Sequence, residues 1–214
     1  MTQWNNTRGI YAITAPELLP GNLLYERVEA ALATGLSLLQ YRNKRASREQ
    51  QLAEVQQLLP LCRRYDTPLL INDDPQLCLQ AGADGVHLGK SDATLTQART
   101  LLGRDAIIGV TCHNDLERAL QAQADGASYV AFGRFYPSQT KPLAPPADTA
   151  ILSRAKARLH LPIVAIGGIN ADNGSPLVSA GADMLAAIHY LFAHPDVSER
   201  VRQLNACFSV SAHR

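Results

Sequence analysis

Eight short apolar runs divide the chain, and stretches in which apolar residues recur every three or four positions separate them. Short apolar runs are typical of strands, whereas the longer spacing is typical of helices that bury one face. The pattern predicts strands at Ile10–Thr14, Leu36–Tyr41, Leu69–Asn72, Gly85–Leu88, Ala106–Thr111, Tyr129–Phe135, Ile163–Ile166 and Met184–His189.

Helical spacing is clearest at Leu23–Leu32 and at Glu49–Leu59. Ser47 precedes the second of these stretches and Gln50 stands three positions after it, which is the spacing of a capping box. This helix is therefore expected to begin just after Ser47. A last helix is expected from the region of Pro195 to about Phe208.

A quasi-repeat marks the approach to every second strand. Thr34-Gly35, Ala81-Gly82, Asp125-Gly126 and Ala180-Gly181 each lie between a helix and the next strand. Glycine readily takes the left-handed conformation that ends a helix before a tight turn. These repeated units predict an α/β fold, a (β/α)₈ TIM barrel, with residues 1–214 as a single catalytic domain. A doubly wound open sheet is the alternative.

Composition excludes several classes of protein. Of the 214 residues, 20 are Lys or Arg and 19 are Asp or Glu, so the net charge of +1 lacks the basic excess of a nucleic-acid binder. No run approaches the roughly 18 apolar residues that span a membrane, and the N-terminus lacks the apolar core of a signal peptide. We expect a cytoplasmic protein without nucleic-acid or membrane partners, whose four scattered cysteines are buried thiols.

Polar residues gather where the strands are expected to end, and (β/α)₈ barrels place their active sites there. After the second strand, Gln40, Arg42 and Lys44 share one face, and Leu39 and Tyr41 share the other. If the latter two pack on the helices, the polar three point into the barrel mouth. Neighbouring cations predict an anionic ligand. The alternative is a solvent-exposed strand end that pairs with acidic residues.

Asp73 and Asp92 follow the third and fourth strands and are expected at the same mouth. Mg²⁺ takes one or two carboxylates together with phosphate and water oxygens, so this pair predicts a magnesium site. In the alternative interpretation, Asp92 and one of Asp73 and Asp74 cap the helices that follow.

The fourth and fifth strands add further candidates. Thr111 offers a hydroxyl at the mouth, and His113 is a candidate acid or base. His87 has two interpretations, as a site residue or as a hydrogen-bonded core histidine.

Two later segments suit a phosphate group. Ser138, Thr140 and Lys141 place hydroxyl donors and a cation on the loop after the sixth strand. Gly167-Gly168 lets backbone N–H groups approach an anion closely, and the eighth strand ends nearby at Ile188-His189. Two anion-binding regions predict a reaction between a pyrophosphate ester and an acceptor that carries a monophosphate.

Together these residues resemble the thiamine-phosphate synthase family over nearly the whole chain. The matching segments, in the family's order, are Tyr11-Ala12-Ile13-Thr14, Gln40-Tyr41-Arg42-Asn43-Lys44, Ile71-Asn72-Asp73, Gly85-Val86-His87-Leu88-Gly89 with Asp92, Ile108-Gly109-Val110-Thr111, Gly133 through Lys141, and Ile166-Gly167-Gly168-Ile169. The set is specific as a whole, whereas no single segment is.

The resemblance implies a Mg²⁺-dependent transferase that joins hydroxymethylpyrimidine pyrophosphate to a thiazole phosphate and releases thiamine phosphate and pyrophosphate. It implies that ionisation of the pyrimidine ester precedes capture of the cation by the thiazole nitrogen. Carried over to this chain, the resemblance implies that the pyrimidine pyrophosphate is held by Gln40, Arg42, Lys44 and Asn72, and that Mg²⁺ is bound by Asp73 and Asp92. It implies that Thr111 replaces a family serine and that Lys141 contacts the pyrophosphate. It also implies that the thiazole phosphate is contacted by Ser138 and Thr140 and that its phosphate group is surrounded by Gly167, Gly168, Ile188 and His189.

The chain departs from the family pattern at four positions. Arg134 stands where Pro is common, Ser138 where Thr is common, Lys90 where Gln is common and His189 where Ser is common. Two alternative functions stay open: a barrel similar to the thiazole tautomerases, which His113 favours, and a non-catalytic barrel that binds a phosphorylated metabolite. The sequence predicts no oligomeric state.

Overall fold

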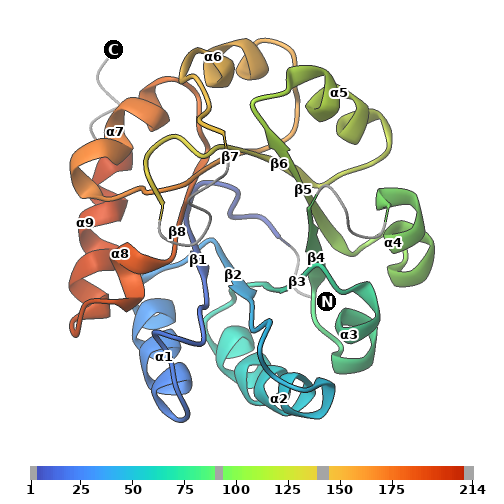
Figure 1. The fold of residues 1–214 in the computed structure, drawn as a ribbon, viewed down its shortest axis with the longest axis vertical. Helices are drawn as coiled ribbons and strands as arrows, with labels where there is room; N and C mark the ends of the chain where they lie inside the picture. Colours follow the sequence, from blue (N-terminus) through green and yellow to red (C-terminus); the bar gives the residue numbers. More distant parts are fainter. Residues whose placement is uncertain (1–3, 90–93, 139–144, 210–214) are drawn as a thin grey trace.

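The computed structural model describes residues 4–89, 94–138 and 145–209. Its strands form a closed parallel barrel in chain order, because β8 pairs with β1 (Figure 1). This closure confirms the (β/α)₈ fold and contradicts the open-sheet alternative. The strands are β1 (Gly9–Ile13), β2 (Leu38–Tyr41), β3 (Leu69–Asn72), β4 (Gly85–Leu88), β5 (Ile107–His113), β6 (Tyr129–Phe132), β7 (Ile163–Ile166) and β8 (Met184–Ala187).

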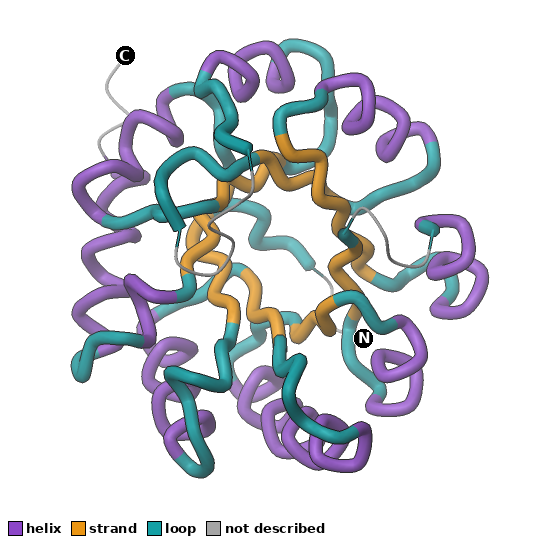
Figure 2. The backbone as a smooth tube through the Cα atoms, in the orientation of Figure 1, coloured by secondary structure: helices purple, strands orange, loops and turns teal. Residues whose placement is uncertain are grey.

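Helices form a ring around the barrel (Figure 2). They are α1 (Leu23–Thr34), α2 (Arg48–Arg64), α3 (Pro75–Ala81), α4 (Leu95–Leu102), α5 (Leu116–Ala124), α6 (Ala150–Lys156), α7 (Ala171–Ser179), α8 (His189–Phe192) and α9 (Val197–Ser209). None of the helices in the described ranges is both long and apolar enough to cross a membrane.

The structure moves several predicted strand ends. β6 ends at Phe132 rather than Phe135, because Gly133 has φ +150° and turns the chain away from the strand direction. β8 ends at Ala187 rather than His189, which begins α8 instead. β5 runs on to His113, two residues past its predicted end, across a register shift against β6. All three changes lie at the mouth of the barrel.

The four predicted turn glycines have positive φ: Gly35 +109°, Gly82 +69°, Gly126 +87° and Gly181 +118°. Gly82 shows the reason most clearly. It is a left-handed residue that ends α3, and its N–H donates to the carbonyl oxygens of Cys78 and Leu79. Such a conformation is costly for residues with a Cβ atom, so the pattern of glycines does locate these turns.

The structure shows which of the acidic residues that could cap a helix do so. Ser47 accepts a hydrogen bond from the Gln50 backbone and caps α2, as predicted. Asp74, rather than Asp73, caps α3 by accepting from the Leu77 backbone at 2.8 Å. Thr94 caps α4. The interpretation of Asp92 as the cap of that helix is therefore wrong.

Two apolar layers hold the barrel together. The outer layer lies between strands and helices and includes Leu39 and Tyr41, as the alternation predicts. The inner layer fills the barrel and includes Leu70 and Met184. Trp4 packs on this inner layer from the N-terminal segment.

All four cysteines are buried, as predicted: Cys62, Cys78, Cys112 and Cys207. Burial raises the pKa of the thiols of Cys62, Cys78 and Cys112 to about 12. They therefore stay protonated and behave as small apolar side chains at neutral pH.

The packing of α2 on the barrel predicts how much the free energy of unfolding falls when a buried side chain is shortened. Leu58 is fully buried in the outer layer, whereas Leu79 on α3 is 53% exposed. We expect Leu58→Ala to lower the free energy of unfolding by about 2–5 kcal/mol in urea titrations, because buried methyl groups leave a void. Leu79→Ala is the control and should change it by less than about 0.5 kcal/mol. Equal losses in the two variants would contradict this assignment of the core.

Candidate active site

The carboxyl ends of the strands surround a cavity of about 460 Å³. Its walls carry polar groups from all eight strands or from the loops that follow them, and the sequence separates these groups by up to 179 positions, from Tyr11 to Tyr190. The predicted site residues that line it are Gln40, Arg42, Asn72, Asp73, Thr111, Ser138, Gly167, Gly168, Ile188 and His189. Three further predicted residues, Asp92, Thr140 and Lys141, lie outside the described residues.

The end of β2 is fixed by a threonine that directly follows β1. The Thr14 hydroxyl accepts from the backbone N–H of Arg42 at 2.8 Å, and the Thr14 N–H donates to the Gln40 carbonyl oxygen at 2.9 Å. These bonds extend the β1–β2 pairing past the last strand residue. Arg42 is therefore held at the mouth by its own backbone rather than by a flexible loop.

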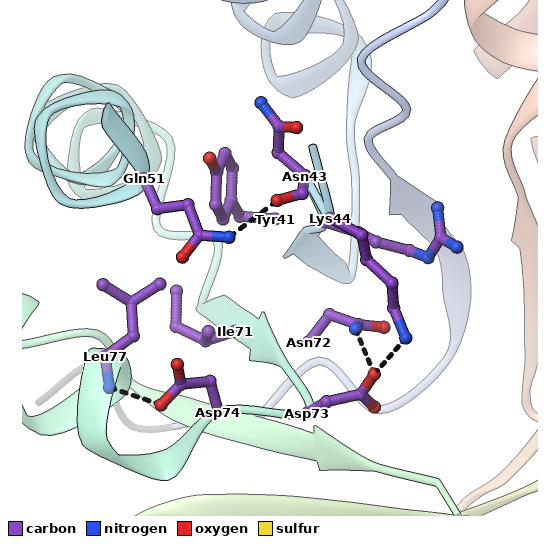
Figure 3. Close-up of a pocket in the computed structure, with 10 residues that line it drawn as sticks. Tyr41, Asn43, Lys44, Gln51, Ile71, Asn72, Asp73, Asp74 and Leu77 are labelled. Carbon is purple, nitrogen blue, oxygen red and sulfur yellow. Dashed lines mark hydrogen bonds and ion pairs between the residues drawn. The ribbon is translucent and has the colours of Figure 1, made fainter. Parts of the chain in front are cut away.

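A second, polar pocket of about 360 Å³ lies beside the mouth between the ends of β2 and β3 (Figure 3). Lys44 lines this pocket rather than the central cavity. On its outer side, Glu54 accepts from the Tyr41 hydroxyl at 2.6 Å and from Asn43 Nδ2 at 3.1 Å. Burial, reinforced by Glu54, raises the pKa of Tyr41.

Asp73 stands between the two pockets. Figure 3 shows Lys44 and Asn72 meeting at one of its carboxylate oxygens, with Lys44 Nζ at 2.7 Å and Asn72 Nδ2 at 2.6 Å from Oδ2. Asp73 has φ +63°, and its N–H donates to the His87 carbonyl oxygen at 2.9 Å. The alternative that the β2 end pairs with an acidic residue is thus correct for Lys44. That ion pair is partly exposed and contributes about 0–1 kcal/mol, so an anionic ligand can displace it.

Beneath the cavity, five polar side chains form a chain of hydrogen bonds across the barrel. Gln40 Nε2 donates to the Tyr11 hydroxyl at 2.5 Å, and the Tyr11 and Tyr129 hydroxyls are 2.7 Å apart. His87 joins Tyr129 through Nδ1 at 2.8 Å and the Thr111 hydroxyl through Nε2 at 2.8 Å. We call Gln40, Tyr11, Tyr129, His87 and Thr111 the floor relay. His87 is therefore both a hydrogen-bonded core histidine and part of the cavity wall.

Burial sets the protonation of the floor relay. Desolvation raises the pKa of both Tyr11 and Tyr129, and the contact with Tyr11 raises that of Tyr129 further. Their hydroxyls remain protonated at any pH near neutrality, so they act as hydrogen-bond donors and not as bases.

On the far side of the cavity, the loop after β6 is joined to the end of β7. The N–H of Phe135 donates to the Ile166 carbonyl oxygen at 3.1 Å, and that of Tyr136 donates to the Gly167 oxygen at 3.0 Å. A Cβ atom on Gly168, which has φ +65°, would collide with the Pro137 carbonyl oxygen. The glycine pair therefore brings Ser138 and the end of β7 to the same wall.

His113 and His189 occupy different positions at the mouth. His113 is the last residue of β5, has φ +54° and lines the cavity. The helix that follows begins only at Leu116 and is capped by Asp115. His189 is the first residue of the four-residue helix α8 and lines the cavity beside Tyr190.

Sequence reasoning missed Tyr11 and Tyr129 as site residues. Alternation does place Tyr11 inside the barrel with Ile13, which was the available signal. Gly109 makes room for this tyrosine, because a Cβ atom there would collide with the Tyr129 ring. Arg134, noted only as a departure, lines the cavity as well.

Comparisons with known proteins identify this architecture. The family model described as thiamine monophosphate synthase matches residues 10–191. The chain is 50% identical to the thiamine-phosphate synthase of Alcanivorax borkumensis over 206 residues, which are 95% of each protein. The chain belongs to the thiamine monophosphate synthase family. It is also 50% identical to the thiamine-phosphate synthase of Marinobacter nauticus, over 94% of this chain and 91% of that one.

A solved structure agrees with the family. The thiamine phosphate pyrophosphorylase of Pyrococcus furiosus superposes with a TM-score of 0.87 at 30% identity, covering 97% of this chain and 98% of that one. Membership confirms the resemblance drawn from the motifs and the predicted activity, a transferase that makes thiamine phosphate. The substrates are accordingly small molecules.

The buried tyrosines predict an alkaline loss of stability. Above pH about 10, Tyr129 ionises in the unfolded chain but stays protonated in the fold, because its pKa is raised there. The folded state then binds more protons, so the free energy of unfolding falls as pH rises toward the folded pKa. We expect Tyr129→Phe to make this fall shallower by about 1.4 kcal/mol per pH unit.

Urea titrations of both proteins between pH 8 and pH about 11 check this expectation. The values near pH 8 serve as the control, since Tyr129 is protonated there in both states. Identical slopes above pH about 10 would show that Tyr129 ionises equally in the folded and unfolded chains.

Proposed function

We propose that residues 1–214 act as one catalytic domain, which condenses hydroxymethylpyrimidine pyrophosphate with a thiazole phosphate in the central cavity. One observation carries this proposal: the two regions suited to anions face each other across one cavity. Arg42 and Asp73 lie at the ends of β2 and β3, and Gly167-Gly168 lies at the end of β7. In a closed barrel of eight strands, β3 and β7 are diametrically opposite.

The size and lining of the cavity suit two small heterocycles. A volume of about 460 Å³ lies within the usual range for small-molecule sites, about 300–1,000 Å³. Apolar side chains cover much of the wall, among them Ile13, Ala131, Ile166 and Ala186. These surfaces exclude water from a reactive cation, which water would otherwise capture before the thiazole nitrogen did.

Departure of pyrophosphate is the step that most needs charge stabilisation. In a dissociative reaction the C–O bond breaks first, and negative charge grows on the leaving group. Arg42 lines the cavity, and its backbone N–H is bonded to Thr14. Lys44 lines the neighbouring polar pocket, and its side chain is exposed. We assign both, together with Lys141, to that charge, and Thr111 and Gln40 to the pyrimidine. Asn72 supports Asp73 through its amide.

The donor set at the mouth fits a magnesium ion of limited protein coordination. Asp73 presents a hard carboxylate at the cavity, and within the described residues no group of three or more His, Cys, Asp or Glu gathers around it. Mg²⁺ commonly takes one or two carboxylates and fills its shell with substrate phosphates and water. Asp73 and Asp92 would hold it, and when bound it would neutralise pyrophosphate oxygens.

The opposite wall receives the phosphate of the thiazole. Gly167 and Gly168 expose backbone at the end of β7, and Ser138 adds a hydroxyl from the adjoining loop. Thr140 has the same role by sequence. Ile188 and His189 complete this wall, with the imidazole of His189 where the family commonly has a serine hydroxyl.

A turnover assay tests the proposed function. The purified chain, given Mg²⁺ and both substrates, should form thiamine phosphate and pyrophosphate in equal amounts. Product at the level of an enzyme-free control would overturn the proposal. The same assay distinguishes it from a tautomerase-like or purely regulatory barrel.

Arg42 is expected to act on the leaving group. We expect Arg42→Ala to lower kcat by about 100-fold or more, since removal of one preorganised group that stabilises developing charge commonly costs 10²–10³-fold. Arg45→Ala is the matched control, because Arg45 is exposed three residues along and lines neither pocket. Equal losses in both variants would remove Arg42 from the pyrophosphate site.

Asp73 is expected to control the magnesium requirement. We expect Asp73→Asn to raise the Mg²⁺ concentration for half-maximal rate by about tenfold or more, because a neutral amide replaces the anionic ligand. Asp74→Asn is the neighbouring control, since asparagine also serves as a helix cap. An unchanged Mg²⁺ titration of Asp73→Asn would exclude Asp73 as a ligand.

A further inference from the structure

The floor relay connects Gln40 to Thr111 through three side chains, of which Tyr11 and His87 also line the cavity and Tyr129 is buried below it. Gln40 and Thr111 stand at its ends and line the cavity, on β2 and β5. Tyr11, Tyr129 and His87 join them through consecutive bonds of 2.5, 2.7, 2.8 and 2.8 Å. Such an uninterrupted line of good distances makes the groups interdependent.

The first donor determines the direction of every later bond. Gln40 Nε2 donates to the Tyr11 hydroxyl, so the hydrogen of that hydroxyl is left for Tyr129, its other hydrogen-bond partner among the described residues. Tyr129 then donates to Nδ1 of His87, which must be unprotonated at that nitrogen. The imidazole hydrogen therefore sits on Nε2 and is donated to Thr111, whose own hydroxyl hydrogen remains available.

The packing of the aromatic rings holds the hydroxyl groups of the floor relay in their positions. The Tyr129 ring lies nearly parallel to the His87 ring at 5.6 Å and meets the Tyr11 ring edge-on at 5.8 Å. Tyr11 and Tyr129 are 1% and 0% exposed, so neither hydroxyl can turn toward solvent. Gly109 provides the space that the Tyr129 ring occupies, because a Cβ atom there would overlap the ring.

We infer that the floor relay fixes the hydrogen-bonding polarity of the cavity floor, with Gln40 presenting its Oε1 as an acceptor and Thr111 its hydroxyl as a donor. Tyr11, Tyr129 and His87 are then positioning residues, which act through the two ends. An aminopyrimidine complements this floor, since its amino group donates and its ring nitrogens accept. The identity of that substrate rests on the proposed function, whereas the polarity of the relay does not.

Tyr129→Phe tests the inference because it keeps the ring and removes only the central hydroxyl. The first readout is ¹⁵N NMR of the imidazole nitrogens of His87, assigned by comparison with His87→Gln. The wild type should carry its hydrogen on Nε2 with Nδ1 as an acceptor. Loss of the donor to Nδ1 should give Tyr129→Phe a mixture of the two tautomers or a shifted Nδ1 resonance.

The second readout is steady-state kinetics with each substrate varied in turn. We expect the KM for the pyrimidine pyrophosphate to rise about tenfold in Tyr129→Phe and in Tyr11→Phe, which corresponds to about 1.4 kcal/mol. The KM for the thiazole phosphate should stay at the wild-type value. Tyr65→Phe is the matched control, since Tyr65 follows α2 outside the cavity and should change neither constant.

An unchanged His87 resonance in Tyr129→Phe would overturn the inference, as would equal increases in both KM values, which indicate general loosening. Failure of the proposed function has a different signature. The wild type would then make no thiamine phosphate, while the NMR spectra would still report the direction of the relay. The two conclusions are therefore tested separately.

Discussion

Parallel strands pair only side by side, and the hydrogen bonds between β8 and β1 turn eight such pairings into a ring without free edges. This closure is the constraint on which the site depends. Because every strand runs in the same direction, every carboxyl end opens on the same face, and the inner side chains share one core. Groups as distant in the chain as Gln40 and His189 therefore border one cavity. An open sheet would distribute the same residues along a line and leave the two regions proposed to bind anions apart.

Charge is organised locally rather than over the whole protein. A net charge of +1 describes the chain as a whole, yet Arg42 and Lys44 lie beside a pocket that also holds Asp73. Lys44 and Asp73 pair with each other at 2.7 Å. In the proposed function, a pyrophosphate with a divalent cation would carry complementary charges for both partners, so this partly exposed pair could open toward the ligand.

The polar interior gives the cavity floor its rigidity. Most of the inner layer is apolar, and the floor relay crosses it as a connected line in which every hydroxyl has a partner. Buried polar groups are costly when unpaired and specific when fully paired, so the relay tolerates few arrangements. The rings of Tyr129 and His87 add packing that holds the same geometry. The floor of the cavity is thereby held by a network in which Tyr129 is buried and the other four residues line the cavity.

The sequence alone determined the alternation of strands and helices, the turn glycines, the outward direction of Leu39 and Tyr41, and most of the polar residues that line the mouth, because these follow from local periodicity and strand direction. Only the tertiary structure decided which side chains meet. Period-two alternation directs Tyr11 inward but does not name its partner, which depends on ring closure and on the space left at Gly109. Likewise, the pairing of Lys44 with Asp73 and the choice of Asp74 as the cap depend on where two loops finish in space. Partners of this kind are set by distances between strands, which no local pattern encodes.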